Sequence, residues 1–302
     1  QFNASAVGGN HDTWGGEAVV SGVYDRFSGS IGGFLFESDG FRDNSNTEHE
    51  IYNAFGQVAL SPTVNLQAEL GRRHTDYGDI AMHIDPDDFS PTLRTSLDDD
   101  TGRVGLRFSP NKHSTLLLSA IYADREGEQN QVQTVDFGGG FFVDFELDGL
   151  LDENVYQYDA AYIYQRDTFN VTVGGAYADS DREDTFILAE VGFPPDPPET
   201  DDIDLEDTRL YVYGNIMPSP RVIGTVGFSY QDYDHNQVST FNDFSMFPVI
   251  TQVTVRNSFE IDEFNPKLGL RFAATDDVEF RAAYFEVVKP PLSSNRTLEP
   301  TQ

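Results

Sequence analysis

Residues 168–181, TFNVTVGGAYADSD, determine the fold class that this sequence predicts. Apolar or small side chains occupy every second position, and polar or small ones fill the positions between. The apolar set is Phe169, Val171, Val173, Gly175 and Tyr177. A repeat of two residues is typical of a β-strand with one apolar face. No segment of the chain combines a helical apolar stripe with capping residues, so the sequence predicts an all-β protein.

The same alternation continues in both directions and predicts about twelve strands. Their approximate spans are 16–25, 27–36, 48–61, 64–76, 99–109, 114–126, 153–166, 168–181, 205–217, 221–234, 260–273 and 277–288. A tilted strand needs roughly 9–11 residues to cross a bilayer, whereas strands of globular proteins cluster near 5–6. The predicted lengths therefore favour strands that span a membrane.

The predicted connections alternate between very short and long. The short ones are two to five residues in length, such as Asp25-Arg26 and Arg166-Asp167. The long ones are rich in Asp, Asn, Gly and Pro, and cover 37–47, 77–98, 127–152, 182–204 and 235–259. Short turns at one end and long loops at the other are typical of outer-membrane barrels. The sequence thus predicts an antiparallel transmembrane β-barrel with short periplasmic turns and long acidic extracellular loops.

Aromatic residues follow the apolar face of the predicted strands at two heights. The tyrosines near the long-loop end are Tyr52, Tyr122, Tyr156, Tyr158, Tyr177, Tyr230 and Tyr284. Those near the short-turn end are Phe108, Tyr164, Phe169 and Phe272. Two aromatic belts around an aliphatic band are expected of a lipid-facing surface. The alternative is the ordinary enrichment of aromatic residues in strands.

The composition excludes several classes of protein. The chain has 302 residues with 19 Lys+Arg against 51 Asp+Glu, a formal net charge of −32. Such a charge argues against a nucleic-acid partner, because phosphate backbones demand a basic face. The absence of cysteine excludes disulfides and thiolate sites. No apolar run approaches the roughly 20 residues of a membrane helix, which excludes an α-helical membrane protein. The low mean hydropathy leaves a soluble β-rich protein as an alternative.

If the apolar face of each strand contacts lipid, the side chains at the alternate positions face a lumen. The lumen-lining candidates are Glu69, Arg73, Arg103, Arg107, Lys267, Arg271, Glu279 and Arg281, whereas Arg72 and Arg209 are expected to point outward. These charges could line an aqueous channel or hold an inner plug by ion pairs. They could equally pair only with neighbours on adjacent strands.

Metal-binding and catalytic signals are weak. The acidic candidates for a cation are Asp98, Asp99, Asp100, Asp201, Asp202 and Asp204. Their spacing matches neither the EF-hand loop nor the glycine-rich RTX nonapeptide, and a solvated acidic surface is the favoured interpretation. His74 and His83 lie near acidic residues without a metal-ligand spacing. No HExxH or GxSxG motif is present, so the sequence predicts neither an enzyme nor a cofactor. A protease or lipase barrel would need a polar triad at the long-loop rim, and no candidate for one stands out.

The C-terminal stretch 263–302 resembles a known family. It contains EFNPKLGLRF at 263–272, VEFRAAYF at 278–285, KPPL at 289–292 and NRTLEPTQ at 295–302. These segments resemble the later barrel strands of TonB-dependent-receptor-like outer-membrane proteins. A similar segment also occurs in outer-membrane barrels that carry tetratricopeptide repeats. The preceding chain agrees with these families in pattern alone.

The resemblance implies a barrel of about 22 strands around an N-terminal plug, with energy delivered by TonB. Neither a plug nor a TonB box is found in the sequence, so residues 1–302 are expected to be one barrel segment, truncated at both ends. The expected partners are lipid of the Gram-negative outer membrane and, through a missing N-terminal part, TonB or a periplasmic partner. The expected function is uptake of a nutrient or metal complex. The alternative is a structural or export barrel, or a porin, that anchors a surface polymer or protein assembly.

Overall fold

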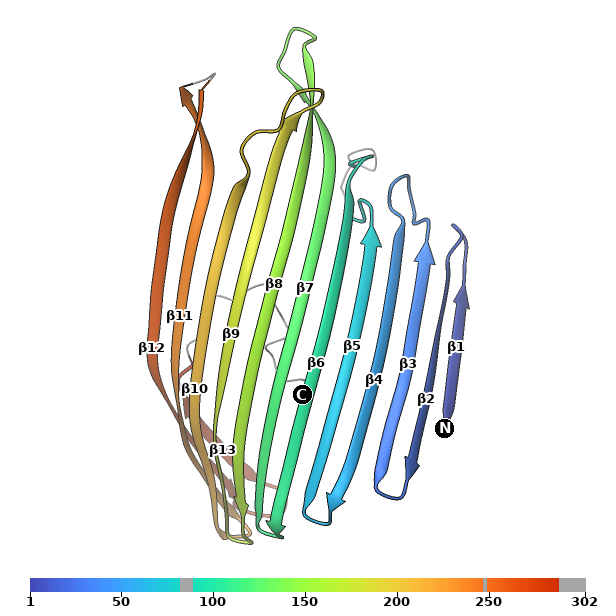
Figure 1. Ribbon diagram of the computed structural model, residues 1–302. Helices are drawn as coiled ribbons and strands as arrows, with labels where there is room; N and C mark the ends of the chain where they lie inside the picture. Colours follow the sequence, from blue (N-terminus) through green and yellow to red (C-terminus); the bar gives the residue numbers. More distant parts are fainter. Residues whose placement is uncertain (82–88, 247–248, 288–302) are drawn as a thin grey trace.

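The computed structural model describes residues 1–81, 89–246 and 249–287. They form one antiparallel sheet whose strands are neighbours in chain order (Figure 1). The strands are β1 Phe2–Gly8, β2 Trp14–Tyr24, β3 Phe27–Ser38, β4 Thr47–Ser61, β5 Val64–Tyr77, β6 Arg94–Asn111, β7 Ser114–Asp136, β8 Phe142–Gln165, β9 Phe169–Glu190, β10 Glu199–Ser219, β11 Val222–Met246, β12 Val249–Ala273 and β13 Glu279–Phe285.

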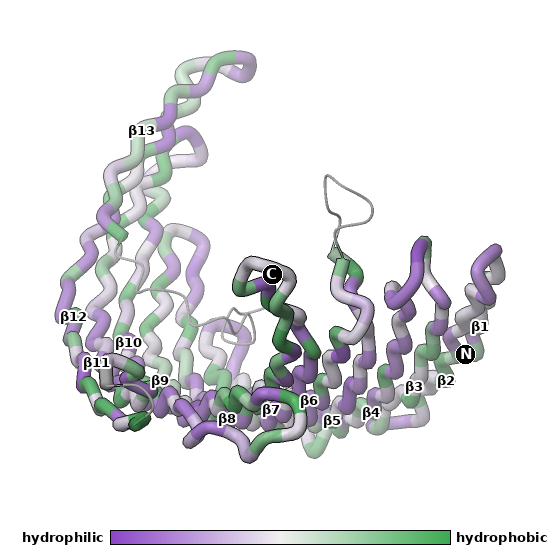
Figure 2. Tube along the Cα trace, turned by 90° about the horizontal axis from the view of Figure 1, so that it is seen from above, coloured by the Kyte–Doolittle hydropathy of each residue, from purple (hydrophilic) through white to green (hydrophobic). Residues whose placement is uncertain are grey.

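The sheet is a curved wall. Seen from above, the strands follow an arc from β1 round to β13, with a convex and a concave side (Figure 2). Within the described part of the chain, β1 pairs with β2 alone and β13 with β12 alone. In those same residues, no helix has the length and apolar character needed to cross a bilayer.

All twelve predicted strands are present, and the sequence prediction missed β1. The seven residues of β1 contain two alanines, a serine and a glycine, so their apolar alternation is faint. The resemblance segments 289–292 and 295–302 lie outside the described residues, as does His83. The antiparallel all-β fold class is confirmed.

Three of the predicted long loops are wrong, because most of their residues are in strands. The connection between β7 and β8 covers only 137–141, where the prediction was 127–152. The β9–β10 connection covers 191–198, so the Pro-rich run ends before β10 begins at Glu199. β11 and β12 likewise extend through most of 235–259. Hydrogen bonding to a neighbouring strand stabilises these polar segments, although their sequences lack apolar alternation.

The long strands are longer than a membrane is thick. β11 has 25 residues, which is roughly 80 Å of strand and nearly 60 Å of height at a tilt of about 45°. A bilayer with its headgroups measures about 40–45 Å. The sheet therefore has a lower part that can span the bilayer and an upper part beyond it, at the end with the longer connections.

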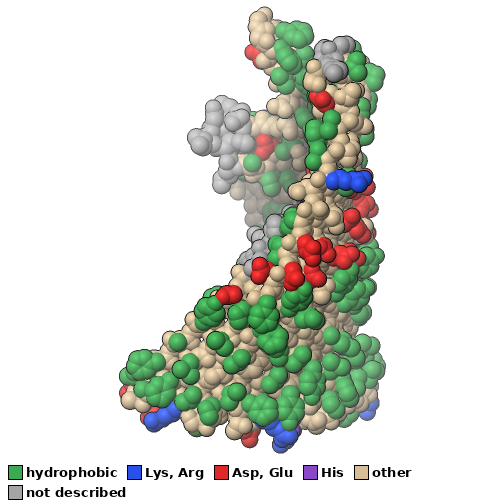
Figure 3. Space-filling model, turned by 90° about the vertical axis from the view of Figure 1, so that its left-hand side faces the viewer, with side chains coloured by type: hydrophobic (Ala, Val, Ile, Leu, Met, Phe, Trp, Pro, Cys, Tyr) green, Lys and Arg blue, Asp and Glu red, His purple; other side chains and the backbone are tan. Residues whose placement is uncertain are grey.

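The convex side of the lower part is apolar. Figure 3 shows hydrophobic side chains over the lower half of this side and acidic ones above them. Register aligns the apolar residues across strands, for example Leu66 with Leu106 and Leu106 with Leu118. Leu70 is 65% exposed and Leu210 is 55% exposed. A continuous exposed apolar band of this kind suits lipid and not water.

Candidate functional site

Seven tyrosines follow the upper edge of the apolar band. Register places all of them on the convex face, where Tyr122 pairs with Tyr156 and Tyr158 with Tyr177. The rings of Tyr122 and Tyr156 are 5.0 Å apart. Tyr122 also donates from its hydroxyl to Asp124 at 3.3 Å. The other members are Tyr52, Tyr230 and Tyr284. Apolar rings below and hydroxyls bonded to carboxylates above are the arrangement that a membrane–water interface favours.

Carboxylates cover the convex face directly above these tyrosines, and we name them the outer acidic belt. By register the belt comprises Asp98, Asp100, Asp124, Glu126, Asp152, Asp179, Asp181, Glu183, Asp202, Asp204, Glu206, Asp232, Asp234, Glu260 and Asp262. Burial, reinforced by Asp179 and Asp204, raises the pKa of Asp181 above its ordinary value. The belt therefore carries mutual repulsion that salt will screen.

The six aspartates that the sequence analysis named as candidate cation ligands lie on opposite faces of the sheet. Asp98 and Asp100 lie on the convex face beside Arg72, whereas Asp99 points to the concave face. Likewise Asp202 and Asp204 belong to the outer acidic belt, whereas Asp201 lies on the concave face. A different set, Asp232, Asp234 and Glu260, brings its carboxylate oxygens within 4.8 Å of one another. The structure thus does not gather the six into one site.

His74 lies on the convex face between two carboxylates. Its Nε2 is 3.0 Å from Asp76 and its Nδ1 is 3.0 Å from Asp98. Burial lowers the pKa of His74, but the bonds to the two carboxylates outweigh burial, so the pKa is raised above its ordinary value. The stabilisation that this histidine provides is present below its unfolded-state pKa and is lost as the pH rises through the raised folded-state pKa.

The predicted lumen residues all lie on the concave face. Arg103 is 3.5 Å from Glu69, and Arg73 is 2.9 Å from Asp99. Glu279 accepts from both Arg271 and Arg281. Neighbour pairing, the simpler of the two sequence interpretations, therefore describes most of these charges.

Arg107 and Lys267 lack carboxylate partners within the described residues. Arg107 donates to Ser109 at 3.3 Å, and Lys267 donates to the Tyr213 hydroxyl at 3.1 Å. The expectation that Arg209 points outward is wrong, because it shares the concave face with Ala176 and bonds Asp207 at 2.7 Å. Arg72 points outward as expected.

An inner ionic row crosses four strands on the concave face; it comprises Arg73, Asp99, Arg125 and Glu153. Arg125 bonds Asp99 at 2.6 Å and Glu153 at 3.3 Å. Glu153 is 1% exposed, and it also accepts from Ser180 at 3.4 Å. Sequence analysis missed Arg125 and Glu153, since the signal that pairs them is the register between β7 and β8.

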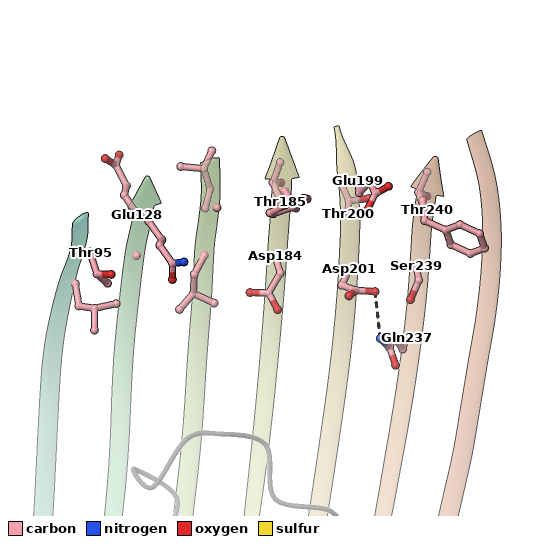
Figure 4. Close-up of a pocket in the computed structure, with 18 of the residues that line it drawn as sticks. Thr95, Glu128, Asp184, Thr185, Glu199, Thr200, Asp201, Gln237, Ser239 and Thr240 are labelled. Carbon is pink, nitrogen blue, oxygen red and sulfur yellow. Dashed lines mark hydrogen bonds between the residues drawn. The ribbon is translucent and has the colours of Figure 1, made fainter. Parts of the chain in front are cut away.

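A recess, which we name the upper groove, lies on the concave face above the tyrosine level and has a volume of about 560 Å³ (Figure 4). Its apolar lining includes Leu97, Leu151, Phe186 and Phe241, and its polar lining includes Thr95, Gln129, Asp184, Glu199, Asp201, Gln237 and Ser239. Arg182 bonds Asp184 at 2.8 Å, and Gln237 donates to Asp201 at 3.1 Å. None of the described residues that line the groove is a lysine or arginine.

A lower groove of about 410 Å³ lies on the same face, further down β10. Its lining residues on this face are Gln157, Asp159, Ala176, Ala178, Asp207, Arg209, Tyr211, Tyr213, Ser229 and Gln231. Tyr211 and Tyr213 stack with their centroids 5.5 Å apart. Each ring covers a glycine on the neighbouring strand, Tyr211 over Gly174 and Tyr213 over Gly227.

Gly227→Ala is expected to destabilise the sheet by about 1–3 kcal/mol. A Cβ at this position would overlap the Tyr213 ring and lie 2.9 Å from the carbonyl oxygen of Val212. Gly224→Ala, on the same strand, is the control, because a Cβ there meets only the Ile216 carbonyl oxygen at 4.0 Å. Urea unfolding in detergent should separate the two variants; equal midpoints would contradict the packing of Tyr213 on Gly227.

Two connections at the upper end are fastened by a buried ion pair. Arg42, in the β3–β4 connection, bonds Asp79, in the β5–β6 connection, at 2.9 Å. The side chains are 12% and 6% exposed. Arg42 also donates to the Ala81 carbonyl at 2.8 Å and lies over the ring of Phe89. We name Arg42 and Asp79 the loop clasp.

Comparison with protein families gives a match over most of the chain. The family model described as TonB dependent receptor-like, beta-barrel matches residues 83–300. A search of curated proteins found no match. The family match covers all but the last two residues of the resemblance stretch 263–302 and extends far upstream of it.

Solved structures share the fold at low sequence identity. The ferric-catecholate import receptor Fiu from E. coli matches with a TM-score of 0.80 and 11% identity, over 96% of this chain and 55% of that receptor. The ferric yersiniabactin uptake receptor FyuA from Yersinia pestis gives 0.69 and 12%, over 92% and 44%. The siderophore receptor PiuA from Acinetobacter baumannii gives 0.68 and 12%, over 94% and 48%. The chain spans about half the length of these receptors.

Proposed function

Because this chain belongs to the TonB-dependent receptor-like β-barrel family, whose members are outer-membrane proteins of Gram-negative bacteria, we propose that it is part of the barrel wall of an uptake transporter. The transporter carries a nutrient or a metal complex inward. TonB, or another periplasmic protein, supplies the energy through a part of the protein outside these residues.

The arrangement of the concave face is the observation that carries this proposal. The upper groove lies beyond the membrane, and the lower groove lies further down the same face toward the short-turn end. Asp201 and Tyr213 belong to the two grooves and are twelve residues apart on β10, which is about 40 Å of strand. Two recesses along one wall, polar inside and apolar outside, suit a path through the membrane.

Uptake can be tested in cells that lack the gene. We expect the deletion strain to deplete at least one component of the medium more slowly than the complemented strain, as measured by mass spectrometry. A protonophore should abolish the difference if uptake is energised. Equal depletion of every component, together with loss of a surface polymer, would contradict uptake and support the anchoring or export alternative. A difference that survives the protonophore would indicate a porin.

The barrel-segment proposal has its own measurement. Extraction of the native protein in detergent should give a band that shifts on heating and an intact mass above the 33.7 kDa of these residues. A heat-shifting band is expected because a closed barrel remains compact in detergent until it is unfolded. An intact mass of 33.7 kDa would show that these residues are the whole protein and would overturn the proposal that they are one segment.

A further inference from the structure

We propose that the upper groove binds a neutral, hydroxyl-rich chain, that is, an oligosaccharide. This inference rests on the uptake function proposed above and names the class of substrate. It comes from the chemistry of the groove lining: carboxylates, amides and hydroxyls stand beside apolar side chains, without a lysine or arginine among the described lining residues.

Charge argues against an anionic ligand in this groove. The lining has four carboxylates, and within the described residues only Asp184 has a cationic partner, Arg182. An anionic metal chelate would be repelled by the other three, Glu128, Glu199 and Asp201, and would lose hydration without gaining an ion pair. A neutral ligand avoids both penalties.

Hydroxyl groups suit the polar lining. Asp201 accepts from Gln237 through Oδ1, and Glu199 accepts from the Asn242 backbone N–H through Oε1. No hydrogen bond to the second oxygen of either carboxylate is present within the described residues, so both remain acceptors for ligand hydroxyls. The side-chain amide of Gln129 can donate to ligand oxygens. A sugar ring offers both kinds of partner at once.

The apolar lining and the length of the groove favour a chain of rings over a single one. Leu97, Leu151 and Phe241 present apolar surface that can pack against the C–H face of a ring. Leu97 lies on β6 and Phe241 on β11, five strand spacings apart, which is roughly 24 Å. Further down, the stacked Tyr211 and Tyr213 offer a second aromatic surface beside polar groups.

The absence of cysteine from these residues makes a labelling test direct. Ser239→Cys in the full-length protein, purified in detergent, is treated with a hydrophilic maleimide. Maltohexaose, cellohexaose and xylohexaose serve as neutral probes, spermine as the cationic probe and ferric citrate as the anionic one. We expect at least one neutral oligosaccharide to slow labelling about tenfold when saturating, and the charged probes to leave the rate unchanged.

Two further variants, made in the Ser239→Cys protein, assign the effect to the groove. Asp201→Asn should weaken protection by about tenfold, because it changes the acceptor on the concave face. Asp202→Asn is the matched control, because Asp202 follows Asp201 on β10 but lies on the convex face. This variant should leave protection unchanged. Equal effects of the two variants would overturn the assignment of the groove.

Every other outcome also decides the proposal. Protection by spermine or ferric citrate, or by no probe at all, overturns the oligosaccharide class. If the Ser239→Cys protein does not react without ligand, another part of the protein covers the groove, which overturns binding there. Protection by an oligosaccharide in a protein whose deletion leaves uptake unchanged would keep the groove chemistry and reject the uptake function.

Discussion

Arg125→Met is expected to lower the free energy of unfolding by about 3–5 kcal/mol. The substitution removes the cation that lies between Asp99 and Glu153 in the inner ionic row. Asp99 keeps Arg73 at 2.9 Å, but Glu153 is 1% exposed and keeps only the Ser180 hydroxyl among the bonds described above. Most of the lost stability comes from the buried carboxylate that remains without its cation.

A second substitution tests that reasoning. Arg125→Met with Glu153→Leu removes both charges, and most of the lost stability should return, because replacing a buried pair by apolar residues is often close to neutral. Arg72→Met is the control, since Arg72 is 62% exposed and lies 3.6 Å from Asp98, where an ion pair contributes at most about 1 kcal/mol. Urea unfolding in detergent measures all three. A double variant as unstable as Arg125→Met would contradict the proposed cause.

Strands could be predicted where lipid lies on one side and water on the other, because that difference enforces alternation. Residues 168–181 show this, and their strand is present as β9. Above the membrane both faces contact water, so alternation is no longer required. The stretch from Glu126 to Asn130 has no apolar residue, yet it continues β7 and pairs with β8. A polar extension of this kind cannot be separated from a loop by its sequence pattern.

Parity predicted the face of a side chain but not its partner. Arg73 and Arg103 lie on the concave face as expected, but the bonds they make depend on the register between β5 and β6. The predicted face of Arg209 was wrong because the apolar residues of β10 change faces along the strand. Leu205 lies on the same concave face as Arg209 and is 4% exposed, whereas Leu210 lies on the convex face and is 55% exposed. An apolar side chain therefore does not mark the lipid side above the membrane.

Asp79→Ala is expected to open the β5–β6 connection about a hundred- to several-thousandfold more often, since removing one partner of a buried ion pair costs about 3–5 kcal/mol. The carboxylate holds Arg42 at 2.9 Å, the Ser90 N–H at 2.8 Å and the Ala81 N–H at 3.1 Å. Without it, the guanidinium in the loop clasp, 12% exposed, lacks its counter-charge. The loss is local, because the clasp joins two connections and no strand.

Limited proteolysis of the folded protein in detergent measures this opening. The rate of cleavage between β5 and β6 should rise steeply in Asp79→Ala, while the urea midpoint of the whole sheet changes little, because cleavage follows the population of the locally open form. Asp276→Ala is the matched control: Asp276 is 97% exposed and lies 3.8 Å from Arg221 at the opposite end of the sheet. Its removal should change neither rate nor midpoint. If Asp79→Ala were cleaved no faster than this control, the loop clasp would not hold the two connections together, and they would owe their position at the groove end of the wall to the strands alone.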